Sequence, residues 1–215
     1  PFWLKPFRLT RAASIRLEPS PTCSMRSTRI ARSAALLLVI ALVGRTGTFL
    51  NKGSTNLRSK ITEAEVLAAQ KGWGDALVNI SMTYEAEGFE AAKARAEQVI
   101  DGAYGYNYGP VLFKPTLAGG SQTFRTTRAG ALAYFVGGDK SFPDDKGFAL
   151  KGWRKVEIVN SAIFREGNLA ITVGNVLFTD KTGAVTKVDK TWAFFKGRDR
   201  KLRIVAHHSS LPYQG

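Results

Sequence analysis

Two side-chain chemistries are nearly missing from this chain of 215 residues, which holds one cysteine and two histidines. Cys23 lies near the start, so the rest of the chain can form no internal disulfide, thiolate metal site or cysteine nucleophile. His207 and His208 are neighbours, and neighbouring strand residues point to opposite faces of a sheet. They cannot both bind one metal ion. A catalytic zinc site, which ordinarily uses three protein ligands, is therefore not expected.

Familiar motifs and an even charge distribution are also missing. The sequence contains no H-E-x-x-H spacing, no P-loop and no G-x-G-x-x-G ahead of a helix, so no nucleotide site is indicated. Residues 1–60 carry eleven Lys or Arg and one acid, whereas residues 61–215 carry 20 basic and 16 acidic residues. Most of the formal charge of +14 thus belongs to the front of the chain. Nucleic-acid binding stays only a weak alternative.

The front of the chain is interpreted as segments outside the fold. Residues 1–24 mix Arg, Pro and Ser without periodicity, as in a translated upstream region or an artefact of the gene model. Residues 25–48 combine a basic start, ten apolar residues from Ala34 to Val43, and small residues, which is the layout of a signal peptide. A bilayer span needs roughly 20 apolar residues. No stable membrane insertion is therefore expected once the signal is removed.

Residues 49–60 are basic, rich in hydroxyl groups and free of acid, a composition typical of a transit peptide. A signal followed by a transit segment resembles the two-part address of plastids that are reached through the secretory route, so a plastid is the expected location. The alternative is a linker after an export signal in a periplasmic or secreted protein. Residues 61–213 are expected to form a single domain, and about 150 residues are enough for one well-buried core.

Helices are predicted in the first half of this domain. A capping box, Thr62-x-x-Glu65, predicts the start of the first helix. Apolar residues at helical spacing then define its buried face: Val66, Trp73, Leu77, Ile80 and Tyr84. A second helix is predicted to end by Gly102, and a third, short one to begin at Thr127. Three tyrosines between them, at 104, 106 and 108, are interpreted as a packed aromatic turn rather than a pocket rim.

Strands are predicted in the second half. A short strand ends at Pro115, and four longer strands lie within residues 153–164, 169–177, 188–194 and 202–210. Helices followed by an antiparallel meander indicate an α+β fold. A curved antiparallel sheet wrapped around N-terminal helices makes a cone, the architecture of the nuclear-transport-factor-2-like (NTF2-like) folds. Such folds host enzymes and association modules alike, so the fold does not settle the function.

The last strand carries the most informative polar residues. Alternation predicts that Val205, His207 and Ser209 share one face, and that Ile204 and His208 share the other. An imidazole and a hydroxyl on one wall indicate a pocket for a small polar or anionic molecule. A Ser–His nucleophile is not expected, because side chains two residues apart on one face are too distant for a tight pair.

Four segments resemble motifs of the iota-class carbonic anhydrases, which share their fold with the association domain of calcium/calmodulin-dependent kinase. The segments are Phe-Lys-Pro-Thr at 113–116, Ala-Tyr-Phe-Val-Gly-Gly at 133–138, Asp-Lys-Gly-Phe-Ala-Leu at 145–150 and His-His-Ser-Ser-Leu-Pro-Tyr at 207–213. The resemblance covers about residues 61–213. It implies a carbon–oxygen lyase that reversibly hydrates CO₂ to bicarbonate.

The resemblance also implies the site. Bicarbonate would be held without a metal by the hydroxyls of Thr116, Tyr134 and Ser209, in a partly apolar pocket. CO₂ could be accepted near Phe113, Phe135 and Val205. It implies no cofactor, although some members have been described as metal-assisted, and a hard cation held by carboxylates stays open. Hydroxyl donors placed for bicarbonate would stabilise the negative charge that hydration builds on the oxygens.

The proton acceptor is predicted from the residue inventory. An imidazole, with an unperturbed pKa of about 6.5, is the only ordinary base at neutral pH. His207 lies beside the implied bicarbonate site on the same strand face, so it is predicted to accept the proton of water, directly or through a hydroxyl.

Three alternatives stay open at this point. The first is an association domain that only dimerises. The second is an isomerase or dehydratase on the same fold, which would need a carboxylate base in the pocket, with Glu157 as the only acid well inside a predicted strand. The third is a protein that binds bicarbonate without turnover. A homodimer is expected in each case, because the open face of the sheet needs covering.

Overall fold

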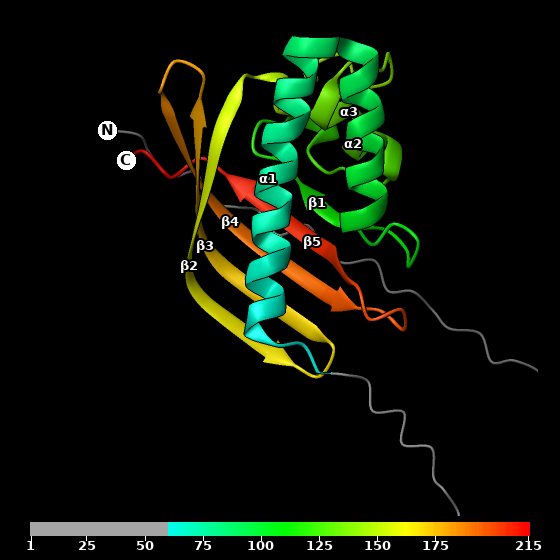
Figure 1. Ribbon diagram of the computed structural model, residues 1–215, viewed down its shortest axis with the longest axis vertical. Helices are drawn as coiled ribbons and strands as arrows, with labels where there is room; N and C mark the ends of the chain where they lie inside the picture. The colour runs from blue at the N-terminus through cyan, green and yellow to red at the C-terminus, as the bar shows by residue number, and fades with distance from the viewer. Residues whose placement is uncertain (1–59) are drawn as a thin grey trace, which may run out of the picture. The chain divides into compact units, whose positions relative to one another are not determined.

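The computed structural model describes residues 60–215. The upstream segment predicted for residues 1–24, the signal peptide predicted for 25–48 and all but the last residue of the transit segment 49–60 lie outside the described residues, as does Cys23. Within residues 60–215, no helix is both long and apolar enough to cross a membrane. Helices precede a meander of strands in this part of the chain, as predicted (Figure 1).

The long helix α1 (Glu63–Glu87) begins at the predicted capping box. The Thr62 hydroxyl accepts a hydrogen bond from the Glu65 backbone N–H at 3.2 Å, and the Thr62 N–H donates to the Glu65 carboxylate at 2.9 Å. Apart from the tyrosine nearest its end, the predicted apolar stripe of the helix is buried. Gly74 lets α1 lie close to the sheet, because a Cβ atom there would come within 3.1 Å of Val156.

Two further helices, α2 (Phe89–Ala103) and α3 (Arg128–Val136), complete the helical layer. Gly88 turns the chain between α1 and α2 with a φ of 88°, a conformation that other residues rarely adopt. Thr127 caps α3 as predicted, because its hydroxyl accepts the Gly130 N–H at 3.1 Å. Two short 3₁₀ turns lie in the connecting segments: η1 (Gly120–Gln122) and η2 (Phe148–Leu150).

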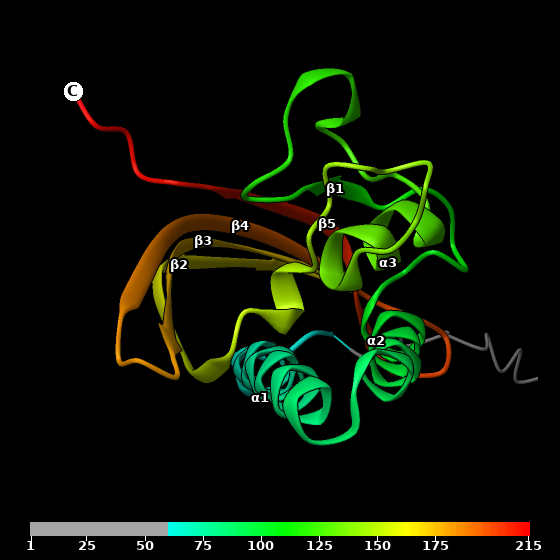
Figure 2. The same ribbon diagram turned by 90° about the horizontal axis from the view of Figure 1, so that it is seen from above.

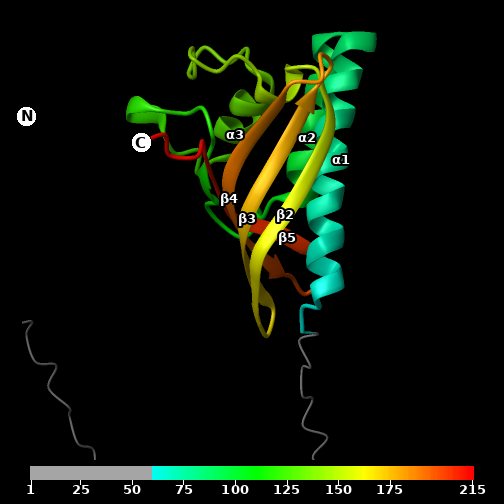
Figure 3. The ribbon, with the colours of Figure 1, turned by 90° about the vertical axis from the view of Figure 1, so that its left-hand side faces the viewer.

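Five strands form one sheet in the order β1-β5-β4-β3-β2. Their bounds are β1 (Leu112–Lys114), β2 (Trp153–Glu166), β3 (Leu169–Asp180), β4 (Val185–Lys196) and β5 (Leu202–Ser210). The last four make the predicted antiparallel meander, while β1 joins the edge parallel to β5, a pairing that was not predicted. The sheet curves toward α1 and α2 (Figure 2), and β2 to β4 slant past α1 (Figure 3). The predicted α+β cone is confirmed.

A β-bulge in β2 changes which of its residues face the helices. The register with β3 shifts between Asn160 and Ala162. Strict alternation would place Ala162 and Phe164 on the same side as Val156. Both are instead exposed, while Ile163 packs against the core. The bulge splits β2 into two halves of opposite phase.

Another bulge lies in β5 and sets the orientation of the last strand. Val205 has no partner on β4, because the residues on either side of it pair with two successive residues of that strand. The expectation that Val205 shares a face with His207 and Ser209 is wrong. Ile204 takes that place in the core and is 2% exposed. The bulge thus lets three residues of β5 face inward although their spacing is not strictly two.

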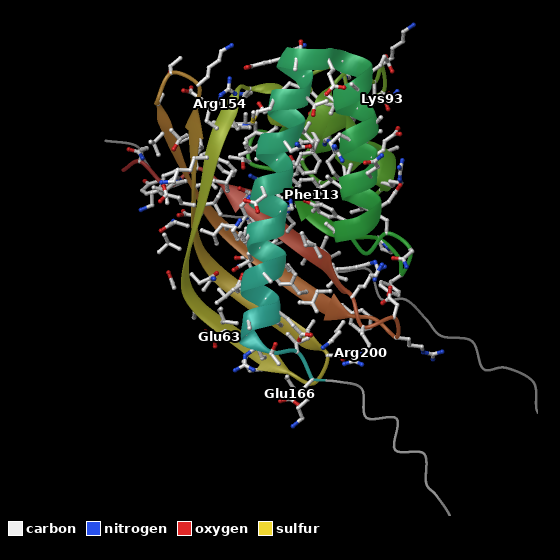
Figure 4. The ribbon with its side chains drawn as sticks, viewed as in Figure 1. Glu63, Lys93, Phe113, Arg154, Glu166 and Arg200 are labelled. Atoms are coloured by element: carbon white, nitrogen blue, oxygen red, sulfur yellow. The ribbon has the colours of Figure 1, made fainter. Side chains whose placement is uncertain are left out.

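Aromatic side chains fill the space between the helices and the inner face of the sheet. Phe113 lies in the interior, whereas Glu63 and Arg200 lie at the rim of the domain (Figure 4). The Phe113 ring stacks on Phe135, with ring centroids 5.8 Å apart. Such rings bury much apolar surface and leave little room for water.

Candidate active site

A small cavity lies between β5, the residues that follow β1, and helix α3. Its volume is about 10 Å³, close to the lower limit for one water molecule. Its lining consists of Trp73, Phe113, Pro115, Thr116, Tyr134, Phe135, Phe148, Lys190, His207 and Ser209. The structure thus brings together six of the seven residues that were expected at the site from the sequence. Val205, expected nearby, is not part of the lining.

The two aliphatic hydroxyls of the site form a pair. Thr116 Oγ1 and Ser209 Oγ lie 2.6 Å apart, and either atom can be the donor. The parallel pairing of β1 with β5 brings them together, since Phe113 lies opposite His207 and Thr116 follows only three residues later. Lys114 reinforces this edge by donating from Nζ to the Ser209 carbonyl oxygen at 2.9 Å.

Tyr134 reaches the cavity from α3. Its ring stacks on Phe148, with centroids 5.5 Å apart, and meets Phe113 edge-on at 5.7 Å. The hydroxyl is buried and makes no hydrogen bond of good geometry with any described residue. Burial raises its pKa above the usual range, while the neighbouring Leu117 backbone and Thr116 side chain partly oppose that rise. Tyr134 is therefore a protonated hydroxyl that lacks an acceptor.

His207 is buried on the inner face of β5. Its ring stacks on Phe113, with centroids 4.6 Å apart, and meets Trp73 edge-on at 5.5 Å. Burial lowers the pKa of His207 well below its ordinary value, and the charges of Lys190 and His208 lower it further. His207 is thus a weaker base than the unperturbed imidazole assumed from the sequence.

Both ring nitrogens of His207 have partners, in a hydrogen-bonded chain of four side chains. Trp73 Nε1–H donates to the Tyr104 hydroxyl oxygen at 3.0 Å. That oxygen lies 2.9 Å from His207 Nδ1, and His207 Nε2 lies 3.0 Å from Lys190 Nζ. Tyr104 does pack among aromatic rings, as the interpretation of the tyrosine turn favoured, but its hydroxyl also holds the site histidine.

Lys190 comes from β4 and is 5% exposed. Its Nζ lies 4.8 Å from the ring centroid of Trp73, 5.5 Å from that of Phe178 and 5.2 Å from that of Trp192. Burial lowers its pKa to about 7. None of the ion pairs found in residues 60–215 includes Lys190. A large fraction of Lys190 is therefore a neutral amine at neutral pH.

Three further residues belong to the site and were not expected there from the sequence: Lys190, Tyr104 and Trp73. For Lys190 a signal was present, because it lies in phase with the buried residues Val188 and Trp192 of the same strand. For the other two, no pattern distinguished a hydrogen-bonded side chain from a packed one.

The cavity lining lacks the residues that the alternative reactions would need. No carboxylate lines it, and Glu157 is exposed and pairs with Lys155 at 3.0 Å. The isomerase or dehydratase alternative therefore lacks its base. Ser209 pairs with Thr116 and not with His207, so no Ser–His nucleophile forms. Within residues 60–215, no three His, Cys, Asp or Glu side chains gather closely enough to hold a metal ion.

A curved sheet packed against helices, with hydroxyls, an imidazole and an amine around one interior cavity, defines a cone-shaped α+β protein with a polar interior site. Comparison with known families gives the particular class. The model of the family described as "Metal-independent carbonic anhydrase" matches residues 64–211. The chain belongs to this family, so the resemblance seen in the sequence is confirmed.

Individual relatives agree with this assignment. The chain is 70% identical over 154 residues to a metal-independent carbonic anhydrase of Nostoc sp., covering 72% of this chain and 75% of that protein. A solved iota-carbonic anhydrase from a cyanobacterium, complexed with bicarbonate, is 69% identical, with a TM-score of 0.72 and 73% and 95% of the two chains covered.

Proposed function

We propose that this domain reversibly hydrates CO₂ to bicarbonate and holds the bicarbonate by the hydroxyls of Thr116, Tyr134 and Ser209. The observation that carries the proposal is the convergence of these three hydroxyls on one cavity, two of them 2.6 Å apart and the third without an acceptor. The family membership and the bicarbonate in the solved cyanobacterial relative support the same reaction.

The site suits both the substrate and the product. CO₂ is apolar, and the rings of Phe113, Phe135 and Phe148 form an apolar wall. Hydration adds a water oxygen to the carbon and leaves negative charge on the oxygens. The Tyr134 hydroxyl would gain an acceptor as this charge develops, because the described residues offer it none. An interaction that strengthens along the reaction lowers its barrier.

The test is CO₂ hydration by the purified full chain after exhaustive EDTA treatment. Ser209→Ala removes one donor, and the loss of one such donor typically lowers turnover about 10²–10³-fold. Ser210→Ala is the matched control, because Ser210 is the next residue of β5 and is not part of the cavity lining. We expect the control to keep wild-type activity.

Three other outcomes would count against this function. No hydration by the wild-type chain would leave the binding or association alternatives. Equal activity of Ser209→Ala and Ser210→Ala would show that the proposed cavity is not the site. Activity lost to EDTA and restored by one metal would keep the reaction but overturn the proposal that hydroxyls suffice.

A homodimer through the outer face of the sheet is also proposed. Phe164 lies opposite Ile171 on the neighbouring strand, and the two side chains are 60% and 37% exposed. Val159 and Val173 extend this exposed apolar area. Burying it against a second copy would remove apolar surface from water. We expect Phe164→Glu to give a monomer in sedimentation velocity, and an unchanged sedimentation coefficient would contradict this interface.

Delivery to a plastid remains a proposal that rests on the sequence of residues 25–60. The basic start, the apolar run and the acid-free segment after it are the supporting features. The family match begins at residue 64, after these features. A fluorescent protein fused behind residues 1–60 should enter the plastid of a cell with plastids reached through the secretory route. Fluorescence in the medium would support the secreted alternative instead.

A further inference from the structure

We propose that the buried ion pair between Arg125 and Asp145 positions the Tyr134 hydroxyl at the bicarbonate site. The inference rests on the proposed function and adds two positioning residues to it. Arg125 Nη2 lies 3.1 and 3.2 Å from the two carboxylate oxygens of Asp145. The two side chains are only 2% and 6% exposed. Neither residue lines the site cavity, so the pair can act on the reaction only through a residue that does.

The ion pair connects the two loops on either side of α3. Arg125 lies in the loop between β1 and α3, and its backbone N–H donates to the Phe113 carbonyl oxygen at 2.8 Å. Asp145 lies in the loop between α3 and η2, and η2 begins at Phe148. The rings of Phe113 and Phe148 both contact the Tyr134 ring. The pair therefore links the chain segments that hold the Tyr134 ring from two sides.

Tyr134 extends from α3 between the two partners. Gly130, Tyr134 and Gly137 are spaced by four and three residues, so they share one face of the helix. A Cβ atom at Gly130 would come within 3.1 Å of Arg125 Cδ, and one at Gly137 within 3.0 Å of the Asp145 carbonyl oxygen. Arg125 thus lies against the turn before Tyr134, and Asp145 against the turn after it. The ion pair spans the face from which the tyrosine projects.

The charges of the pair suit this role better than they suit stability. Burial raises the pKa of Tyr134, and the charge of Asp145 adds to that rise, which keeps the hydroxyl a donor. Arg125 Cζ lies 4.7 Å from the ring centroid of Phe142, but its Nε and Nη1 have no hydrogen-bond partner among the described residues. Buried donors without partners cost stability, whereas a directed ion pair fixes the geometry around it.

The kinetic test replaces the pair by apolar side chains, Arg125→Met together with Asp145→Leu, in the full chain. Apolar replacement of a buried ion pair is often neutral for stability, so the double variant should unfold near the wild-type midpoint. Without the directed contact, the Tyr134 hydroxyl loses its fixed place, and a displacement of about 1 Å can lower turnover about 10²-fold. We expect kcat for CO₂ hydration to fall roughly 10- to 100-fold, with little change in KM.

Arg128→Met is the matched control. Arg128 also belongs to α3, and it pairs with Asp101 at 2.6 Å, but the two side chains are 41% and 59% exposed. It lies outside the cavity lining, so we expect wild-type kcat. Wild-type kcat in the double variant of Arg125 and Asp145 as well would overturn the positioning role and leave the proposed function intact.

A double-mutant cycle with Tyr134→Phe shows whether the pair acts through the Tyr134 hydroxyl. Tyr134→Phe removes this donor and should lower kcat about 10²-fold. Adding the apolar pair should then lower kcat no further, because the group that the pair positions is already gone. Losses that multiply would show that the pair supports the fold in general, and would overturn the proposal.

A second variant covers a failure of the double variant to fold. Arg125→Lys keeps a positive charge opposite Asp145 but lacks the planar guanidinium, and it then takes the place of the apolar pair in the cycle. We expect a smaller loss of kcat, which again disappears in the Tyr134→Phe chain. A loss of the same size in both backgrounds would contradict the proposal.

Bicarbonate binding separates the positioning role from the proposed reaction. A wild-type chain without hydration activity would overturn the reaction, and titration followed by the ¹³C resonance of labelled bicarbonate then tests the pair alone. The double variant of Arg125 and Asp145 should bind bicarbonate about tenfold more weakly than wild type, the loss expected for one hydrogen bond to a charged group. Arg128→Met should bind as wild type does. Equal affinity of all three chains would overturn the positioning role.

Discussion

Lys190 and Lys196 lie on one strand, face the same way and are equally buried, yet their surroundings differ. Lys196 donates from Nζ to the Glu65 carboxylate at 2.6 Å, and this bond is the main cause of the lowered pKa of Glu65. Lys190 meets an imidazole and three aromatic rings. Burial of a charge costs several kcal/mol in either case. A carboxylate offsets that cost for Lys196, whereas Lys190 avoids it by losing its proton near pH 7.

The difference shows that depth of burial does not decide what a lysine does. The available partner decides whether the buried amine is held by a carboxylate or lies against an imidazole and aromatic rings. Strand β4 therefore carries a lysine of the first kind near its end and one of the second kind at its centre. Substitutions at the two lysines and their partners should separate these roles.

The largest expected effect concerns pH and stability at Lys190. Between pH 7 and 10, the unfolded chain, with an ordinary lysine pKa, binds a proton that the folded chain has lost. The contribution of Lys190 to the free energy of unfolding must therefore increase with pH, by about 1.4 kcal/mol per unit. Denaturation of wild type and Lys190→Met at about pH 7 and about pH 9.5 should show their difference move by about 3 kcal/mol in favour of the wild type. A constant difference would contradict a lowered pKa at Lys190.

A smaller effect is expected at the partner of Lys196. Glu65→Gln leaves that lysine buried without an anion, while glutamine can still complete the capping box with Thr62. We expect a loss of about 2 kcal/mol in the free energy of unfolding, below the usual 3–5 for a broken buried pair because the Glu65 side chain is 37% exposed. Hydration kinetics should stay at the wild-type level. Glu63→Gln, a more exposed neighbour, serves as the control.

The smallest effect is expected for a lysine at the surface. Lys71 and Asp75 lie 2.6 Å apart on α1, but their side chains are 76% and 64% exposed. Water already solvates both charges, so Asp75→Asn should change the free energy of unfolding by less than about 0.5 kcal/mol. A change above that of Glu65→Gln would mean that burial has no part in the ranking of the three lysines.

Much of this fold could be predicted from local signals. The capping box at Thr62 and the alternation along β3 and β4 each reflect the geometry of one element, and the structure confirms them. The parallel pairing of β1 with β5 could not be predicted, because a three-residue strand carries no information about its partner. The bulges could not be predicted either, because they depend on the register between strands.

Only those residues of the site that belong to a motif or follow from strand alternation could be predicted from the sequence. Thr116, Tyr134 and Ser209 came from the resemblance, and the structure places them around one cavity. Lys190 was passed over because lysine usually lies at the surface, although its phase with Val188 predicted an inward side chain. The pKa of His207 depends on the aromatic rings that surround it, and these come from distant parts of the sequence.

The unpaired Val205 has a practical consequence for protein engineering. A designer who grafts the His-x-Ser strand onto another cone-shaped scaffold must transfer this extra residue as well. Without it, a strand that keeps its start in the core would present the imidazole and the hydroxyl to solvent. One residue outside the cavity lining would then decide whether the grafted strand presents its polar side chains to the core or to solvent.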